Sequence, residues 1–251
     1  MGPITTSLVA FGCIFGGALF GMYLRRALPE KYLTAEIKDG IKETFVLIVT
    51  MSALVLGLLV ASAKGHFDTE ADGIVQLSAN LISLDRTLAI YGPETKDARA
   101  QLRELILSII ARMHPAKDTQ ALQSGAKARP GEALLGAIQE LAPKDDAQRV
   151  LKSQALSISF NIASTRWLMY LQRATSTPSI LVFVMIFWLA MIFVRLGIFY
   201  PTNAITVPSL FVAALSVSAA VLLIMRLYSP YEGLLQIPIA PLQMALQQIG
   251  Q

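Results

Sequence analysis

The uncharged run at residues 45–63, FVLIVTMSALVLGLLVASA, constrains the fold of this chain more than any other stretch. A helix of about nineteen residues spans the ~30 Å hydrocarbon core of a bilayer. The residues that follow, 64–91, contain no proline, and their large apolar residues recur at alternating spacings of three and four. These residues are Ile74, Leu77, Leu81, Leu84 and Leu88. We therefore predict one helix from about residue 35 to about residue 90, with a stem of roughly 40 Å outside the membrane.

Three other uncharged runs, at residues 3–24, 178–194 and 205–225, are each long enough to cross a bilayer. Hydrophobic residues make up 54% of the chain and charged residues only 15%, and the mean hydropathy is +0.56. This composition is too apolar for a soluble domain of 251 residues, so the excess belongs in lipid. The predicted fold class is all-α: an integral membrane protein with four transmembrane helices and the lipid bilayer as a partner.

The stretch between the second and third spans is predicted to form a large extramembrane helical hairpin. Tyr91, Gly92 and Pro93 end its first helix, because glycine terminates helices and proline cannot continue one. A long amphipathic helix that begins near Asp146 leads back to the third span. The predicted organisation is residues 1–63 for the first two spans and their short polar connection, 64–177 for the hairpin with a mobile loop near 115–130, 178–226 for the third and fourth spans, and 227–251 for an amphipathic C-terminal tail. We expect the short helix of this tail either on the bilayer surface or against the stem.

Glycines recur in the first span at the four-residue spacing that allows two helix backbones to approach closely. They are Gly12, Gly16, Gly17 and Gly21. Small residues four apart are typical of helix–helix contacts in membranes. We expect these glycines to pack against a neighbouring helix of the same chain, and a contact between subunits is the alternative.

A low-bulk, partly polar stripe runs along the second helix beside its apolar seam. Thr50, Gly57 and Lys64 follow one another at intervals of seven residues. If several subunits gather this helix around an axis, the threonine hydroxyl, glycine backbone and lysine charge would line a conduit for ions. The three residues also have simpler interpretations: the hydroxyl bonds back to its own helix, the glycine receives a neighbouring helix, and the lysine extends to the headgroups.

The same seven-residue register continues beyond the bilayer at Ala71, Ser78 and Asp85. A straight helix drifts by about 20° per seven residues. The stripe therefore stays on one face along the stem only if the helix supercoils.

Residues suited to catalysis or metal binding are sparse in this sequence. The chain has two histidines, His66 and His114, and one cysteine, Cys13, and none lies at ligand spacing from another candidate. No glycine-rich phosphate-binding loop occurs. The net charge of +4 is spread along the chain, which predicts no nucleic-acid partner. We therefore expect no enzyme activity, no metal and no cofactor.

Basic residues near the ends of the spans bear on the orientation in the membrane. By the positive-inside rule, their distribution favours by a small margin a cytoplasmic first connection and an external hairpin. The side of the first connection carries Arg25, Arg26, Lys31, Lys38, Lys42 and Arg195, and the other side carries Lys64, Arg166, Arg173 and Arg226.

Four stretches and the layout of the spans resemble the bacterial bestrophin-like family, a membrane domain of unknown function. The layout is two spans, a helical insert and two further spans, and the resemblance covers essentially the whole chain. One departure is that the family usually has an acidic residue two positions before the proline of the last stretch, where this chain has Tyr228. The stretches are Leu28-Pro29-Glu30, LVLGLLVASAKGHFD at residues 54–68, LDRTLAIYGPE at 84–94 and SPYEGL at 229–234.

The resemblance implies a function that the residues alone do not. Bestrophins are oligomeric, mostly pentameric anion channels whose second helix lines the pore, and their termini and large helical region are cytoplasmic. The resemblance thus implies a multi-pass homo-oligomer of the bacterial inner membrane, with the stripe of Thr50, Gly57 and Lys64 nearest the axis and a cytoplasmic hairpin. Its hairpin motif consists of Asp85, Arg86, Tyr91, Gly92 and Pro93. The alternative is a non-conducting scaffold or sensor whose hairpin binds a partner.

Overall fold

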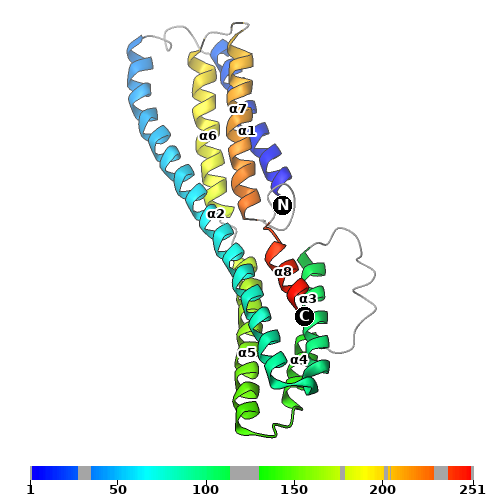
Figure 1. Ribbon diagram of the computed structural model, residues 1–251. Coiled ribbons are helices and arrows are strands. Elements are labelled where there is room, and N and C mark those ends of the chain that lie inside the picture. The colour runs from blue at the N-terminus through cyan, green and yellow to red at the C-terminus, as the bar shows by residue number, and fades with distance from the viewer. Residues whose placement is uncertain are drawn as a thin grey trace. The chain divides into compact units, whose positions relative to one another are not determined.

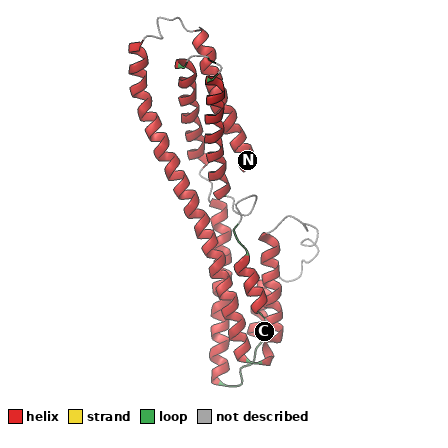
Figure 2. Cartoon of the chain, turned by 45° about the horizontal axis from the view of Figure 1, so that its top comes forward, coloured by secondary structure: helices red, strands yellow, loops and turns green. Residues whose placement is uncertain are grey.

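A computed structural model describes residues 2–27, 35–113, 130–175, 179–200, 203, 205–228 and 237–249. The predicted all-α fold is confirmed, because the regular structure of these residues is helical throughout and contains no strand (Figure 2). The predicted mobile loop near 115–130 lies outside the described residues, apart from Pro130. In chain order the elements are α1 (Pro3–Ala27), α2 (Ala35–Tyr91), the 3₁₀ turn η2 (Pro93–Thr95), α3 (Lys96–Met113), α4 (Pro130–Gln139), α5 (Asp146–Thr175), α6 (Ser179–Phe199), α7 (Thr206–Leu227) and α8 (Ala240–Gln248) (Figure 1).

Four helices in the described part of the chain are long and apolar enough to cross a membrane, which confirms the predicted number of spans. Each overlaps one of the uncharged runs in the sequence. The apolar segments are Pro3–Ala27, Gly40–Tyr91, Ile180–Phe199 and Thr206–Leu227. The second is part of α2, whose 57 residues extend over about 85 Å at 1.5 Å per residue.

The first of two compact units contains residues 1–67 and 177–235. Here α1 packs against both α6 and α7 (Figure 1). Ala10, Ile14 and Ala18, at four-residue spacing on α1, are fully buried, and α2 adds Leu59 and Ala63 to the same core. The packing is apolar because each helix turns one stripe of side chains inward and leaves the remainder for lipid.

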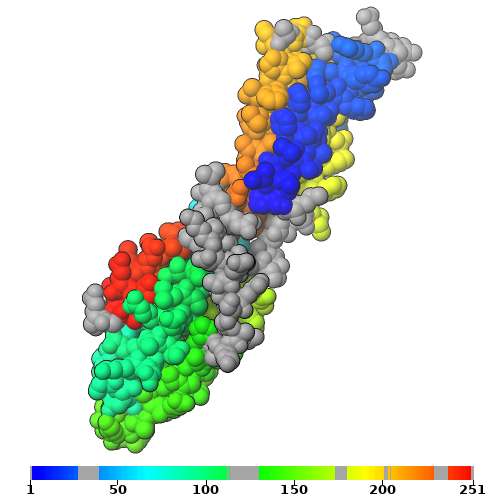
Figure 3. Space-filling view, turned by 90° about the vertical axis from the view of Figure 1, so that its right-hand side faces the viewer, coloured from blue at the N-terminus to red at the C-terminus, as the bar shows by residue number. Residues whose placement is uncertain are grey.

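The second unit contains residues 68–176 and 236–251. The predicted apolar seam of the stem forms its core, and all five of its residues are at most 1% exposed. Helix α8 packs against α3 and buries Leu242 and Ala245, and Figure 3 shows its red side chains lying against the green side chains of this unit. The amphipathic tail therefore has a protein surface for its apolar face.

Candidate functional site

The membrane half of α2 is the least buried of the four apolar helices. Only 11% of its most apolar window is buried inside the chain, compared with 22–28% for the other three. Because an apolar helix is stable in lipid or against another protein surface, this exposure identifies α2 as the span with the most surface for a further contact.

The three stripe residues all lie on the exposed part of this helix. Thr50, Gly57 and Lys64 are each exposed, whereas Leu59 and Ala63 on the same helix are buried in the core of the first unit. The structure therefore separates α2 into an inward apolar face and an outward face that carries the stripe.

Local contacts differ among the three stripe residues. The Thr50 hydroxyl donates a hydrogen bond of 2.8 Å to the carbonyl oxygen of Val46, one turn earlier in the same helix. A Cβ atom added to Gly57 would meet no atom within 4 Å, so no other helix of this chain packs on it at van der Waals distance in the described part. Gly57 thus leaves an open notch on the outward face.

The stripe does not stay on the outward face beyond the membrane half of α2. Ser78 and Asp85, which continue the seven-residue register, are 3% and 6% exposed. This burial agrees with the drift of a straight helix, which amounts to about 80° over four repeats of seven residues. The outward stripe is therefore limited to the membrane segment.

Tyr228, which occupies the position where the family usually has an acidic residue, joins the end of α7 to α2. Its side chain is 8% exposed, and its hydroxyl lies 3.0 Å from the Ser62 hydroxyl. Its ring stacks on the imidazole of His66 with ring centres 5.7 Å apart. A phenol at this position therefore packs two helices of the first unit together, a role that a carboxylate would fill poorly.

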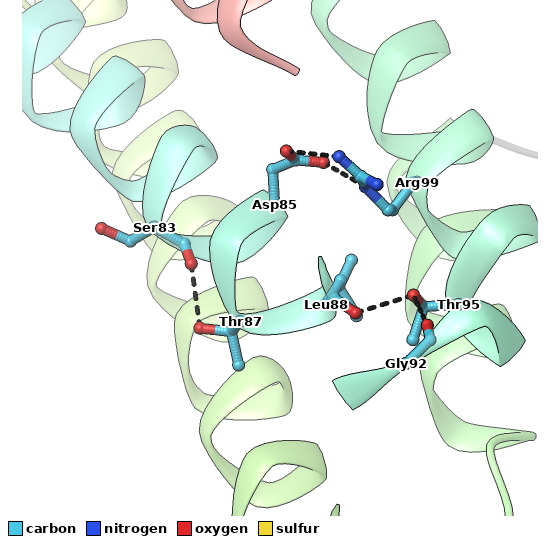
Figure 4. Close-up of polar contacts among 7 residues, drawn as sticks. All are labelled: Ser83, Asp85, Thr87, Leu88, Gly92, Thr95 and Arg99. Carbon is cyan, nitrogen blue, oxygen red and sulfur yellow. Dashed lines mark hydrogen bonds and ion pairs between the residues drawn. The ribbon is translucent and has the colours of Figure 1, made fainter. Parts of the chain in front are cut away.

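Asp85 of the hairpin motif forms a bidentate ion pair with Arg99 of α3 (Figure 4). The two hydrogen bonds measure 2.7 and 2.9 Å, from Nε and a terminal nitrogen of Arg99 to the two carboxylate oxygens. The hydrogen bond to Asp85 raises the pKa of the Arg99 guanidinium. Parallel pairing of this kind fixes the angle between two helices as well as adding electrostatic energy.

Arg86, the next residue of the motif, is exposed and lines a cleft of about 260 Å³ in the second unit. Asp85 lines the same cleft, together with Gln248 of α8 and Ile249 directly after it. The full lining consists of Ile82, Asp85, Arg86, Ala89, Gln248 and Ile249. The structure therefore brings two motif residues to one cleft, while the remaining three lie at the end of α2.

The other three motif residues form the corner after α2: Tyr91 is its last residue, Gly92 follows, and Pro93 begins η2. Gly92 has φ 134° and ψ −177°, a conformation that is essentially restricted to glycine. Thr95 then lies with its hydroxyl 2.7 Å from the Leu88 carbonyl and 2.8 Å from that of Gly92 (Figure 4). These contacts satisfy carbonyls that the last turn of a helix leaves without partners.

Tyr91 is 4% exposed, and its backbone carbonyl accepts a hydrogen bond of 3.0 Å from the Gln148 amide of α5. Burial raises the pKa of the Tyr91 hydroxyl, and the nearby carboxylate of Glu94 raises it further. The phenol is therefore neutral at physiological pH, and the surrounding contacts are those of a structural corner.

Two of the four glycines in α1 lie against α6. A Cβ atom added to Gly21 would lie 2.1 Å from the Val194 carbonyl oxygen, and one added to Gly17 would lie 3.0 Å from that of Ala190. Gly12 and Gly16 would meet no atom within 4 Å. Sequence reasoning missed the glycine on the facing helix, Gly197, whose added Cβ would lie 2.2 Å from the Ala18 carbonyl oxygen.

No group of three or more histidine, cysteine or carboxylate side chains in the described ranges is arranged to hold a metal ion. The outward stripe of α2, the cleft beside Arg86 and the corner at Gly92 are thus the polar features that stand out in the fold. None of them brings a nucleophile and a base together, as acyl or glycosyl transfer would need.

Four apolar helices and a long polar continuation of the second define a multi-pass α-helical membrane protein. Residues 12–242 match the family described as the Bestrophin-like domain, and the chain belongs to the bestrophin-like family. No curated protein and no solved structure matches the chain. Membership points to a channel-type role rather than an enzymatic one.

Proposed function

We propose that this protein is a homo-oligomeric ion channel of the bacterial inner membrane that conducts anions through a pore lined by α2. The pentameric state and the cytoplasmic hairpin follow from the family resemblance. The observation that supports the pore helix is the outward face of α2, which is exposed and carries Thr50, Gly57 and Lys64. An ammonium group is unfavourable in hydrocarbon, and it is stabilised where it borders water on an oligomer axis.

The proposed roles of the three residues follow from their contacts. The Thr50 hydroxyl already donates its proton to Val46, so it presents lone pairs to the conduit unless its side chain rotates. Gly57 leaves the conduit widest, because its notch is open. Anion preference therefore depends on Lys64, whose ammonium would form a ring of positive charge at the end of the span.

The experiment is current measurement in planar bilayers with the purified protein carrying Lys64→Glu. We expect the ratio of anion to cation permeability to fall by about tenfold or more, since clefts of one charge sign change local ion concentrations by at least this factor. Lys96→Glu is the matched control, because Lys96 is an exposed lysine at the start of α3 in the other unit. A wild-type protein without current above background, or equal effects of the two variants, would contradict the proposal.

A second candidate function is a membrane-anchored scaffold whose hairpin binds a partner. The observation in its favour is an exposed apolar surface on α5, where Phe160, Trp167 and Leu168 are 57%, 65% and 56% exposed. A contiguous apolar patch that is exposed on a protein is often a surface that binds a partner. A protein that carries no current and loses a bound partner on Trp167→Ser would favour this function.

A further inference from the structure

Arg195 lies just before the last turn of α6, and its guanidinium contacts two aromatic rings. Its guanidinium carbon is 5.0 Å from the ring centre of Phe45 in α2 and 5.9 Å from that of Phe199. The Nε atom is buried and makes no hydrogen bond. Within the residues that the structure describes, Arg195 has no carboxylate partner. The two rings stabilise the positive charge but accept no hydrogen bond from Nε.

Arg25 of α1 reaches the same end of α6. Its guanidinium donates a hydrogen bond to the carbonyl oxygen of Tyr200, the residue after α6. One turn before Arg25, Gly21 touches the backbone of Val194, so the two helices are in contact next to both arginines. We call these two side chains the Arg25–Arg195 pair.

Described residues that neighbour the pair in sequence carry charges of both signs. Arg26 follows Arg25 in α1, and Lys42 and Glu43 come shortly before Phe45 in α2. Neither arginine of the pair forms an ion pair with a carboxylate in this part of the chain. A partly buried guanidinium is unfavourable without an anion, so Arg195 is a candidate to bind one.

The depth of the pair identifies the source of that anion. Arg195 is near the end of the apolar segment Ile180–Phe199, which places its guanidinium at the level of the lipid headgroups. The planar fork of arginine matches two oxygens of a phosphate. One turn deeper than Phe45, Val49 of α2 is 46% exposed and provides apolar surface for an acyl chain.

We propose that Arg25 and Arg195 bind the phosphate of an anionic phospholipid whose acyl chain lies along α2 beside Val49. A zwitterionic lipid is a weaker ligand, because its own ammonium group already neutralises the phosphate. The site requires insertion in a bilayer but does not require that the protein conducts ions. It ties α1, α2 and α6 together through one ligand at the end of the first unit.

The test uses the full-length protein in phosphatidylcholine nanodiscs, with or without phosphatidylglycerol of the same acyl chains. Native mass spectrometry measures the retained phosphatidylglycerol, and thermal unfolding measures the stabilisation it provides. We expect Arg195→Gln and Arg25→Gln each to lower retention by about tenfold, the loss expected for a charge-assisted bond to phosphate. Arg195→Lys, which keeps the charge but not the fork, should fall between wild type and Arg195→Gln.

Arg26→Gln is the matched control, because Arg26 is exposed beside the pair and makes no contact that the structure shows with α6. It should retain the lipid as the wild type does. Equal losses for Arg26→Gln and Arg195→Gln would show diffuse attraction and overturn the proposal, as would equal retention of the lipid in all variants. If inorganic phosphate in pure phosphatidylcholine discs stabilises the protein as much as phosphatidylglycerol does, the ligand is soluble phosphate and the lipid assignment is wrong.

Discussion

Gly21 and Gly197 determine how closely the backbones of α1 and α6 approach. The added Cβ of each would lie about 2 Å from a backbone oxygen of the other helix, at 2.1 and 2.2 Å. A backbone oxygen cannot turn aside as a flexible side chain can, so a methyl group at either position must separate the helices. In the membrane, close packing is itself a main source of association between helices.

We predict that Gly21→Ala destabilises the first unit by about 1–3 kcal/mol, the usual range for overpacking. Gly16→Ala is the control, because a methyl group there would meet no atom within 4 Å, and it should leave stability unchanged or raise it by at most about 1 kcal/mol. Unfolding in mixed detergent micelles, followed by loss of helical circular dichroism, measures both variants. A loss for Gly16→Ala as large as that for Gly21→Ala would contradict this assignment and indicate that another copy packs on Gly16.

At the scale of elements, α2 ends where its backbone turns into a conformation that only glycine adopts readily. Gly92 is the one glycine with positive φ among the described residues, and Pro93 follows it directly. The turn lets α3 fold back so that Arg99 meets Asp85. The corner and the ion pair therefore depend on each other, although fourteen residues separate the two charges.

We predict that Gly92→Ala destabilises the second unit by about 1–3 kcal/mol, because a side chain there forces a sparsely populated backbone conformation. Gly136→Ala in α4 is the matched control: its added methyl group would meet nothing within 4 Å, and alanine favours the helix by about 0.5–1 kcal/mol. Urea unfolding of the two variants should therefore shift in opposite directions. A stability for Gly92→Ala equal to wild type would show that the corner does not need its present backbone geometry.

The sequence predicts α2 well because three independent signals agree along it. An uncharged run, an apolar seam with helical spacing, and a Gly92-Pro93 stop all specify the same helix, and the buried residues of the seam match the pattern. The candidate pore residues were found by their register within one helix, which is a local property. Their exposure could not be predicted, since it depends on which helices of the chain cover α2.

Contacts between distant segments are what the sequence alone could not supply. Arg86 stands beside Asp85 in the motif, but the carboxylate pairs with Arg99, which reaches it only after α3 folds back. Likewise, Gly197 belongs to no repeating pattern of glycines. Its role as a close contact is visible only because α1 packs against it in the structure. A small residue or a charge in the sequence indicates that a contact is made, but its partner is known only from the folded structure.

At the scale of the whole molecule, the proposed channel depends on what covers the outward face of α2. The orientation of the hairpin is a second, separate property. The chain by itself leaves most of the α2 membrane segment uncovered. In an oligomer, contacts between subunits would cover part of this surface. The stripe would face the aqueous axis. An isolated chain would instead expose the whole stripe to lipid, which is a less favourable environment than water for the Lys64 ammonium.

Two signals for orientation disagree, and their physical basis differs. Basic residues favour a cytoplasmic first connection by a small margin, whereas the bestrophin resemblance implies a cytoplasmic hairpin. The positive-inside rule is weakest for long inserts, because long segments cross the membrane largely irrespective of their charge. We therefore give more weight to the family design and propose that residues 64–177 are cytoplasmic.

Cysteine labelling in intact cells tests this orientation, because Cys13 is the one cysteine of the chain and Cys13→Ser removes it. One span separates Arg26 from Lys96, both of which are exposed. With a membrane-impermeant maleimide, we expect Arg26→Cys to be labelled from outside and Lys96→Cys only after the cells are opened. The reverse pattern would place the hairpin outside the cell. It would also show that the basic residues at the ends of the spans, rather than the family design, determine how this chain inserts.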